Sequence, residues 1–156
     1  QWLPWAVEEP GSVTARGGMQ IGACLAGVSF LKGLGMVHAI SHMVGAEFDT
    51  HHGLTNAIVL PTVLRFNAPA ISHKLPAMSR ALGLENADFE SFDAAICQML
   101  DRLDIPRSLS DIGVPIEAAR SIAEKAHQDA AAATNPREAD VETIERLVIE
   151  AITKGR

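Results

Sequence analysis

Four of the six histidines lie between residues 35 and 61, in a run that is otherwise largely apolar. His38 and His42 are four positions apart, and on a helix this spacing places two side chains on one face, about one turn from each other. His51 and His52 follow shortly after. Imidazole binds zinc and iron and also exchanges protons near neutral pH. The cluster therefore indicates either a metal or catalytic site, or histidines that are only hydrogen-bonded within a core.

The residue after His38 argues against a zinc metalloprotease. Metalloproteases place a glutamate directly after the first histidine of an HExxH helix, whereas the corresponding stretch here is HAISH, with Ala39 at that position. The remaining histidines, His73 and His127, lie in polar surroundings, and we expect both to face solvent. The candidate chemistry is thus confined to the 38–52 segment.

Composition limits the function classes further. The chain has 156 residues, 47% of them hydrophobic, and a net charge of −6, which argues against a nucleic-acid surface. We expect no membrane span or signal peptide, because the weakly polar region around residues 19–43 is interrupted by Lys32, glycines and histidines. Cys24 and Cys97 form no CxxC pair, so we expect two buried free thiols and a cytoplasmic location.

The elements that must position the histidines are predicted to be helices. The apolar spacing predicts a first helix over residues 12–30, capped by Ser12, and a second over 36–48. Asp49 and Thr50 are expected to cap a third helix, in which Pro61 predicts a kink or a restart. Further helices are predicted over 71–83, 88–103, 116–131 and 138–153. With no strand pattern longer than four residues, the predicted fold class is a compact all-α helical bundle, one domain over residues 1–156.

The histidine segment also resembles the signature of a known family. The stretch GLGMVHAISHMVGAEFDTHHGLTNAIVLPTVLRFN is similar to that of the iron-containing (group III) alcohol dehydrogenases, and flanking stretches such as NPREADVETIERLVIEAI resemble their later helices. The residues that carry the resemblance are Gly35, His38, His42, His52, Gly53, Asn56, Ala57 and Pro61. The likeness covers nearly the whole chain.

The resemblance implies a two-domain, dehydroquinate synthase-like fold of which this chain is the C-terminal, all-helical domain. In that family an N-terminal α/β domain binds NAD or NADP, and neither its Gly-Gly-Gly-Ser loop nor the Asp-x-x-x-His helix that supplies two metal ligands is found here. The start at Gln1 rather than Met also suggests a piece of a longer protein. We therefore expect these 156 residues alone to be inactive and to bind NAD weakly.

The resemblance assigns roles residue by residue. His38 and His52 match two ligands of a divalent metal, Fe²⁺ or possibly Zn²⁺, and His42 matches a histidine that helps to move the alcohol proton. His51 is given no ligand role and is expected to mark a helix start. Phe30 resembles an aromatic of the substrate pocket, although its spacing is variable. The implied reaction is oxidation of a small alcohol to an aldehyde or ketone by hydride transfer, in an enzyme that forms dimers or larger homo-oligomers.

Three alternatives stay open at the level of sequence. The first is another enzyme of the same superfamily, such as a glycerol dehydrogenase or a dehydroquinate synthase. The second is a helical module without enzymatic activity that uses the histidines for packing or metal storage. The third concerns the site, because His42 could join His38 and His52 in a three-histidine metal site when upstream ligands are absent.

Overall fold

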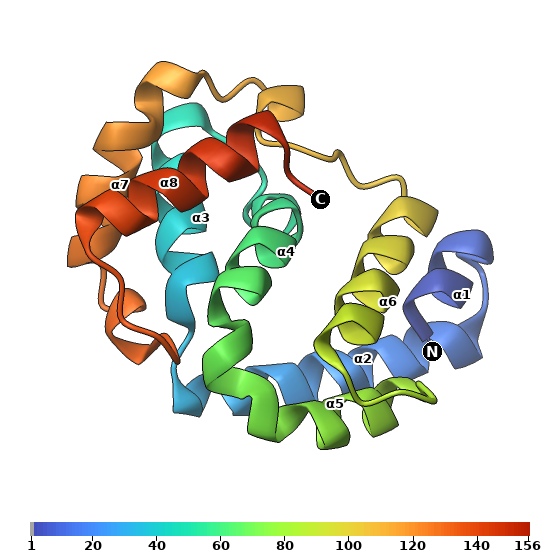
Figure 1. Cartoon of the computed structure of the whole chain (residues 1–156). Coiled ribbons are helices and arrows are strands. Elements are labelled where there is room, and N and C mark those ends of the chain that lie inside the picture. The colour runs from blue at the N-terminus through green and yellow to red at the C-terminus, as the bar shows by residue number, and fades with distance from the viewer. Residues whose placement is uncertain (1) are drawn as a thin grey trace.

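Eight α-helices joined by short turns make up residues 2–156, the part of the chain that this computed structural model describes (Figure 1). No strand occurs within these residues, which confirms the predicted all-α class. The helices are α1 (Trp2–Glu8), α2 (Val13–Ser29), α3 (Gly35–Phe48), α4 (His52–Ile71), α5 (Leu75–Leu82), α6 (Phe89–Arg102), α7 (Ala119–Gln128) and α8 (Val141–Thr153). Short 3₁₀ turns are η1 (Phe30–Lys32), η2 (Ser72–Lys74), η3 (Ser110–Ile112), η4 (Ile116–Ala118) and η5 (Ala132–Thr134).

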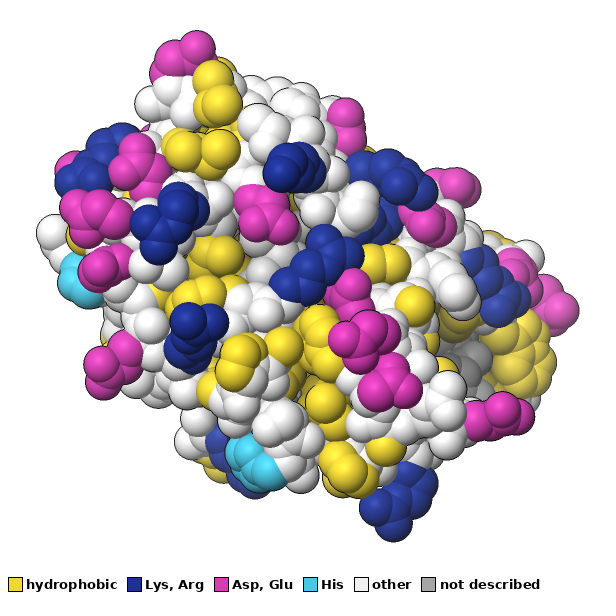
Figure 2. All heavy atoms as spheres, in the orientation of Figure 1, with side chains coloured by type: hydrophobic (Ala, Val, Ile, Leu, Met, Phe, Trp, Pro, Cys, Tyr) yellow, Lys and Arg dark blue, Asp and Glu magenta, His cyan; other side chains and the backbone are white. Residues whose placement is uncertain are grey.

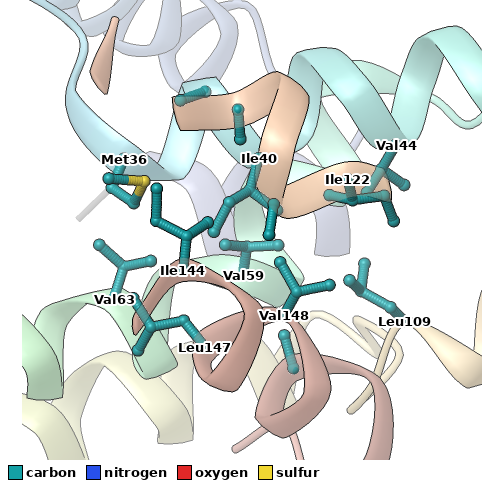
Figure 3. Close-up of a cluster of buried hydrophobic side chains, with 14 of the residues drawn as sticks. Met36, Ile40, Val44, Val59, Val63, Leu109, Ile122, Ile144, Leu147 and Val148 are labelled. Atoms are coloured by element: carbon teal, nitrogen blue, oxygen red, sulfur yellow. The ribbon is translucent and has the colours of Figure 1, made fainter. Parts of the chain in front are cut away.

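The main hydrophobic core lies between α3, α4, α7 and α8 (Figure 3). Apolar residues recur on the inner faces of these helices at three- and four-residue spacing, which is the pattern that buries one side of a helix. The side chains at its centre are Met36, Ile40, Val44, Val59, Val63, Leu109, Ile122, Ile144 and Val148. A smaller cluster joins α5 and α6 to the far side of α4. Helices α3 and α4, which carry the histidine cluster, are therefore held in place by packing against the core.

Local capping residues set several of the predicted boundaries. Ala15 N–H donates to the Ser12 hydroxyl at the start of α2 (3.3 Å), as predicted. Gly83 ends α5 in the left-handed conformation, at φ 72°. The predicted 116–131 helix is shorter in the structure, because Asp129 takes an extended backbone and ends α7 at Gln128.

The predicted cap of α4 is wrong. Asp49 instead ends α3 in the left-handed conformation, at φ 51°, and the Thr50 hydroxyl lies 2.8 Å from that of Thr55. The residue that caps α4 is His51, whose Nδ1 accepts the Leu54 N–H (3.3 Å). Of the kink or restart predicted at Pro61, the restart does not occur, because α4 runs unbroken through this buried proline.

Helix α2 leaves much of its apolar surface uncovered. Its contacts are mainly with α1 and η1, and Ala15 is its only residue buried in the described chain. Ile21 and Leu25 are each 66% exposed, and Cys24 on the same helix is also exposed. The prediction of two buried thiols is therefore wrong: both cysteines are free, but Cys97 is only partly buried. The reason is that an apolar neighbourhood in sequence buries a thiol only where another element covers it.

The surface carries both signs of charge. On the face seen in Figure 2, Lys and Arg side chains are interspersed with Asp and Glu and with small hydrophobic patches. Among residues 2–156, none of the helices taken singly has the length and apolarity of a membrane span; α2 with η1 and α3 would pass together, but they are bent by 102° at the break.

Asp140 links the stability of α8 to pH. Its carboxylate accepts the Thr143 N–H (2.8 Å), and hydrogen bonds from the Thr143 side chain and backbone hold the pKa of Asp140 below its ordinary value. A lowered folded-state pKa means that this stabilisation is complete above the unfolded value, about 3.9, and is lost as pH falls through the folded value. We expect Asp140→Ala to lower the melting temperature at pH 7.

The measurement is thermal unfolding by circular dichroism at pH 7 and at about pH 2.5, where most carboxyl groups are protonated. The difference in melting temperature between the wild type and Asp140→Ala should be smaller at the acidic pH. Glu85→Ala, which removes an exposed carboxylate from the loop before α6, serves as control and should match the wild type at both pH values. A difference of equal size at both pH values would contradict the role of the ionised cap.

Candidate metal centre

The hairpin of α3 and α4 brings the three predicted histidines together. His38 and His42 lie one turn apart on α3, and the sharp turn at Asp49 returns the chain so that His52, the first residue of α4, lies beside them. The ring centroids of His38 and His52 are 5.3 Å apart, those of His42 and His52 5.4 Å, and those of His38 and His42 5.9 Å. Three imidazoles therefore share one small region at the edge of the core.

The Nε2 atoms of two of these rings point at the same atom. Asn56, one turn after His52 on α4, places its amide Nδ2 3.3 Å from His38 Nε2 and 3.0 Å from His52 Nε2. An amide nitrogen can only donate, so both Nε2 atoms accept and both rings carry their proton on Nδ1. This is the tautomer in which a histidine offers Nε2 to a metal. His38 and His52 thus present two ring lone pairs to a common point.

The opposite sides of these rings have different surroundings. His52 Nδ1 lies 3.1 Å from the hydroxyl of buried Ser41, which in turn donates to the His52 carbonyl (3.3 Å). His38 Nδ1 and Asn56 Oδ1 are buried without a hydrogen-bond partner among the described residues. Burial lowers the pKa of His38, the His52 and His42 rings lower it further, and the backbone of Leu34 only partly offsets them. His38 is therefore held as a neutral imidazole, the form that binds metals.

His42 has a different partner, Asp129, which the sequence analysis missed. His42 Nδ1 lies 3.0 Å from Asp129 Oδ2, and the other carboxylate oxygen accepts the Ala131 N–H at 2.7 Å. Burial raises the pKa of Asp129, but the bonds from Ala131 and His42 outweigh it, and the pKa is lowered. Positions 42 and 129 are 87 residues apart, and no spacing rule connects residues so distant.

The start of α3 is fixed by the same distant segment. Leu34 at the N-cap position offers no side-chain bond; instead Gly35 N–H donates to the Thr134 hydroxyl (3.1 Å) and Met36 N–H donates to Asn135 Oδ1 (3.2 Å). Asn135 also exchanges two amide hydrogen bonds with buried Asn67 of α4. The first turn of α3 is thus capped by residues from a distant part of the same chain. The sequence analysis did not predict this cap, because the paired groups are 99 residues apart.

The other histidines lie apart from this cluster. His73 and His127 are exposed, as predicted, and His51 is the helix-start residue that the sequence analysis expected. The Phe30 ring packs edge-on against His38, with 5.8 Å between centroids. Within residues 2–156 no group of three His, Cys, Asp or Glu side chains is arranged to hold a metal ion. His38 and His52 are the two rings of the cluster whose Nε2 atoms face one point, that of the Asn56 amide nitrogen.

Comparisons with known proteins find relatives over almost the whole chain. Residues 1–152 match the model of the Fe-containing alcohol dehydrogenase family, C-terminal part. The 1-propanol dehydrogenase of Salmonella typhimurium is 35% identical over 165 residues, covering 97% of this chain and 45% of its own length. The NAD-dependent methanol dehydrogenase of Bacillus methanolicus is 32% identical over 160 residues, covering 97% and 42%.

A solved structure shows the same fold. A 1,3-propanediol oxidoreductase superposes with a TM-score of 0.91 at 33% sequence identity, over 96% of this chain and 41% of that one. The chain thus spans less than half the length of these relatives. The match over 152 of 156 residues shows that the chain belongs to the Fe-containing alcohol dehydrogenase family and corresponds to its C-terminal helical part.

Proposed function

We propose that this chain is the metal-binding helical domain, residues 1–156, of an NAD(P)-linked alcohol dehydrogenase. In this proposal His38 and His52 each provide Nε2 to a divalent cation, Fe²⁺ or possibly Zn²⁺, and His42 carries the proton of the alcohol. The substrate is a small alcohol or the corresponding aldehyde or ketone. The alcohol and diol substrates in the names of the relatives support this class.

The observation that carries the proposal is the convergence on Asn56. Two ring nitrogens from different helices aim their lone pairs at one amide group, 3.3 and 3.0 Å away. Core packing alone does not require two imidazoles to turn their Nε2 atoms toward one common point. A cation bound there would take the place of the amide donor, and the convergence of the two lone pairs on one point supports the assignment of His38 and His52 as ligands.

The residues of this chain have separate tasks in the reaction. When bound, the metal supplies a Lewis acid for the alcohol oxygen, and the nicotinamide accepts the hydride. His38 and His52 would hold the cation, Ser41 fixes the His52 ring from its Nδ1 side, and Asn56 would give up its bonds to the two Nε2 atoms when the cation binds. His42 lies close to both ligand rings and is one-third exposed, so it can accept the alcohol proton and release it to solvent.

This chain supplies only part of what the proposed reaction needs. Two imidazoles bind a divalent ion weakly, since catalytic sites of this kind use three or more protein ligands. We expect the nucleotide, NAD or NADP, to be bound mainly by the part of the relatives that lies outside the match. The 156-residue chain alone should accordingly neither oxidise alcohols nor bind NAD tightly, and we propose a homodimer for the intact enzyme.

Metal binding by the 156-residue chain tests the ligand assignment. Isothermal titration with Zn²⁺ or Co²⁺ alone should show that His38→Ala and His52→Ala each weaken binding by at least the roughly 10- to 100-fold typical of losing an outer partner of a metal site. His73→Ala replaces an exposed histidine outside the cluster and should leave the affinity unchanged. If these three variants bind the metal with equal affinity, the assignment of His38 and His52 as ligands is refuted.

His42→Ala, measured in the same way, decides between two sites. Unchanged affinity supports a two-imidazole site in which His42 is the proton carrier. A loss as large as that of His38→Ala would show that His42 is a third ligand in this chain, and the catalytic role proposed for it would be withdrawn.

A further inference from the structure

Asp129 is the only carboxylate in the described chain with a hydrogen bond to one of the clustered imidazoles. It lies at the end of α7, and its side chain is 17% exposed. One of its oxygens lies 3.0 Å from His42 Nδ1, and the other accepts the Ala131 N–H at 2.7 Å. Both oxygens are therefore committed to fixed partners, which leaves the carboxylate little freedom to turn.

This arrangement dictates which ring nitrogen of His42 carries the proton. An ionised carboxylate can only accept hydrogen bonds, so the nitrogen that faces it must be N–H. The neutral His42 ring is then protonated on Nδ1 and has its lone pair on Nε2. A neutral imidazole can accept a proton only at its lone pair, so the identity of this nitrogen decides where His42 can act as a base.

We infer that Asp129 is a positioning residue that holds His42 in the Nδ1–H tautomer and thereby makes Nε2 the nitrogen that accepts the alcohol proton. The inference rests on the proposed function for the alcohol, but the tautomer itself is a property of this chain. Among the described residues, the hydrogen bond of Asp129 to the cluster goes to His42 and not to the proposed metal ligands. It also ties the ring to the segment that caps α3, through Ala131 and the η5 turn.

The bond from Ala131 makes one substitution especially informative. In Asp129→Asn the single side-chain oxygen can still accept the Ala131 N–H, and the NH₂ group then faces His42. An NH₂ group can only donate, so His42 Nδ1 must become the acceptor and the ring proton must move to Nε2. The substitution changes the size of the side chain little, yet it should reverse the tautomer.

The experiment is ¹⁵N nuclear magnetic resonance of the 156-residue chain without metal, at a pH at which the imidazoles are neutral. Two-bond nitrogen–carbon-proton correlations identify the protonated nitrogen of each ring. We expect Nδ1–H to be the dominant form of His42 in the wild type and Nε2–H to be dominant in Asp129→Asn. In Asp129→Ala, where neither acceptor nor donor faces the ring, a mixture of both forms should result.

The exposed rings of His73 and His127 are internal controls in every spectrum and should not change between variants. A wild type with Nε2–H dominant at His42, or an Asp129→Asn spectrum identical to that of the wild type, would overturn the inference. If Asp129→Asn fails to fold, the wild-type spectrum and the Asp129→Ala mixture still decide it.

Failure of this inference is distinguishable from failure of the proposed function. The tautomer is read without metal, nucleotide or substrate, whereas the ligand assignment is read from the metal affinities of His38→Ala and His52→Ala. If the metal affinities behave as proposed but the His42 tautomer is unchanged in the Asp129 variants, the metal site is retained. Only the role of Asp129 is then rejected.

Discussion

Ile40→Ala is expected to lower the free energy of unfolding by about 2–5 kcal/mol, the range for emptying a well-packed core position. Ile40 is completely buried and lies on α3 between His38 and His42, pointing into the main core between α4, α7 and α8 (Figure 3). The cavity would lie on the core-facing side of α3, the helix that carries His38 and His42. The loss should be measured by urea unfolding of the 156-residue chain, followed by circular dichroism.

Two controls make this prediction specific. Ile40→Val removes a single methylene and should cost only about 0.5–1.5 kcal/mol. Ile21→Ala changes the same residue type on α2, where the side chain is 66% exposed, and should stay within about 0.5 kcal/mol of the wild type. If Ile40→Ala costs no more than Ile21→Ala, then α3 is not anchored in the core as the structure indicates.

The second large effect is expected at Asn135, far from α3 in sequence. Asn135→Ala removes the acceptor of the Met36 N–H at the start of α3 and both amide bonds to Asn67, which is only 6% exposed. The loss of a cap and the unpaired buried amide together should cost about 2–4 kcal/mol. The start of the histidine helix should also loosen, which amide hydrogen exchange at Met36 would report.

A double-mutant cycle separates these two contributions. Asn67→Ala leaves the cap of α3 in place but removes the amide pair, and the double variant leaves no unpaired amide. We expect the double variant to be more stable than the sum of the single losses predicts, by about 0.5–3 kcal/mol. Losses that add within about 0.5 kcal/mol would show that the Asn67–Asn135 pair contributes nothing of its own.

The sequence predicts the helices well where the signal is local. Ser12 caps α2 and Gly83 ends α5 because each acts within one turn of its own position. His38 and His42 share a face for the same reason, since four-residue spacing on a helix is enough to place them. The place of His52 beside them came from the family resemblance, because it depends on a turn whose conformation no local rule gave.

Non-local features explain what the sequence could not show. Asp49, expected to cap α4, ends α3 instead, and His51 takes the capping role. The partners of Gly35 and Met36 lie 99 residues away, and that of His42 lies 87 away, so pairing them requires the complete fold. Cys24 shows the converse, because an apolar helix gave no sign of which face would be left uncovered.

The stretch from Asp129 to Asn135 contacts α3 at two places along the helix. Thr134 and Asn135 hold its first turn, and Asp129 holds the imidazole of His42 in the next. A displacement of this one stretch would consequently move both the start of α3 and the His42 ring. The start of the helix that carries His38 and the orientation of the His42 ring thus depend on one stretch, and a substitution that displaces the backbone of residues 129–135 is expected to shift both.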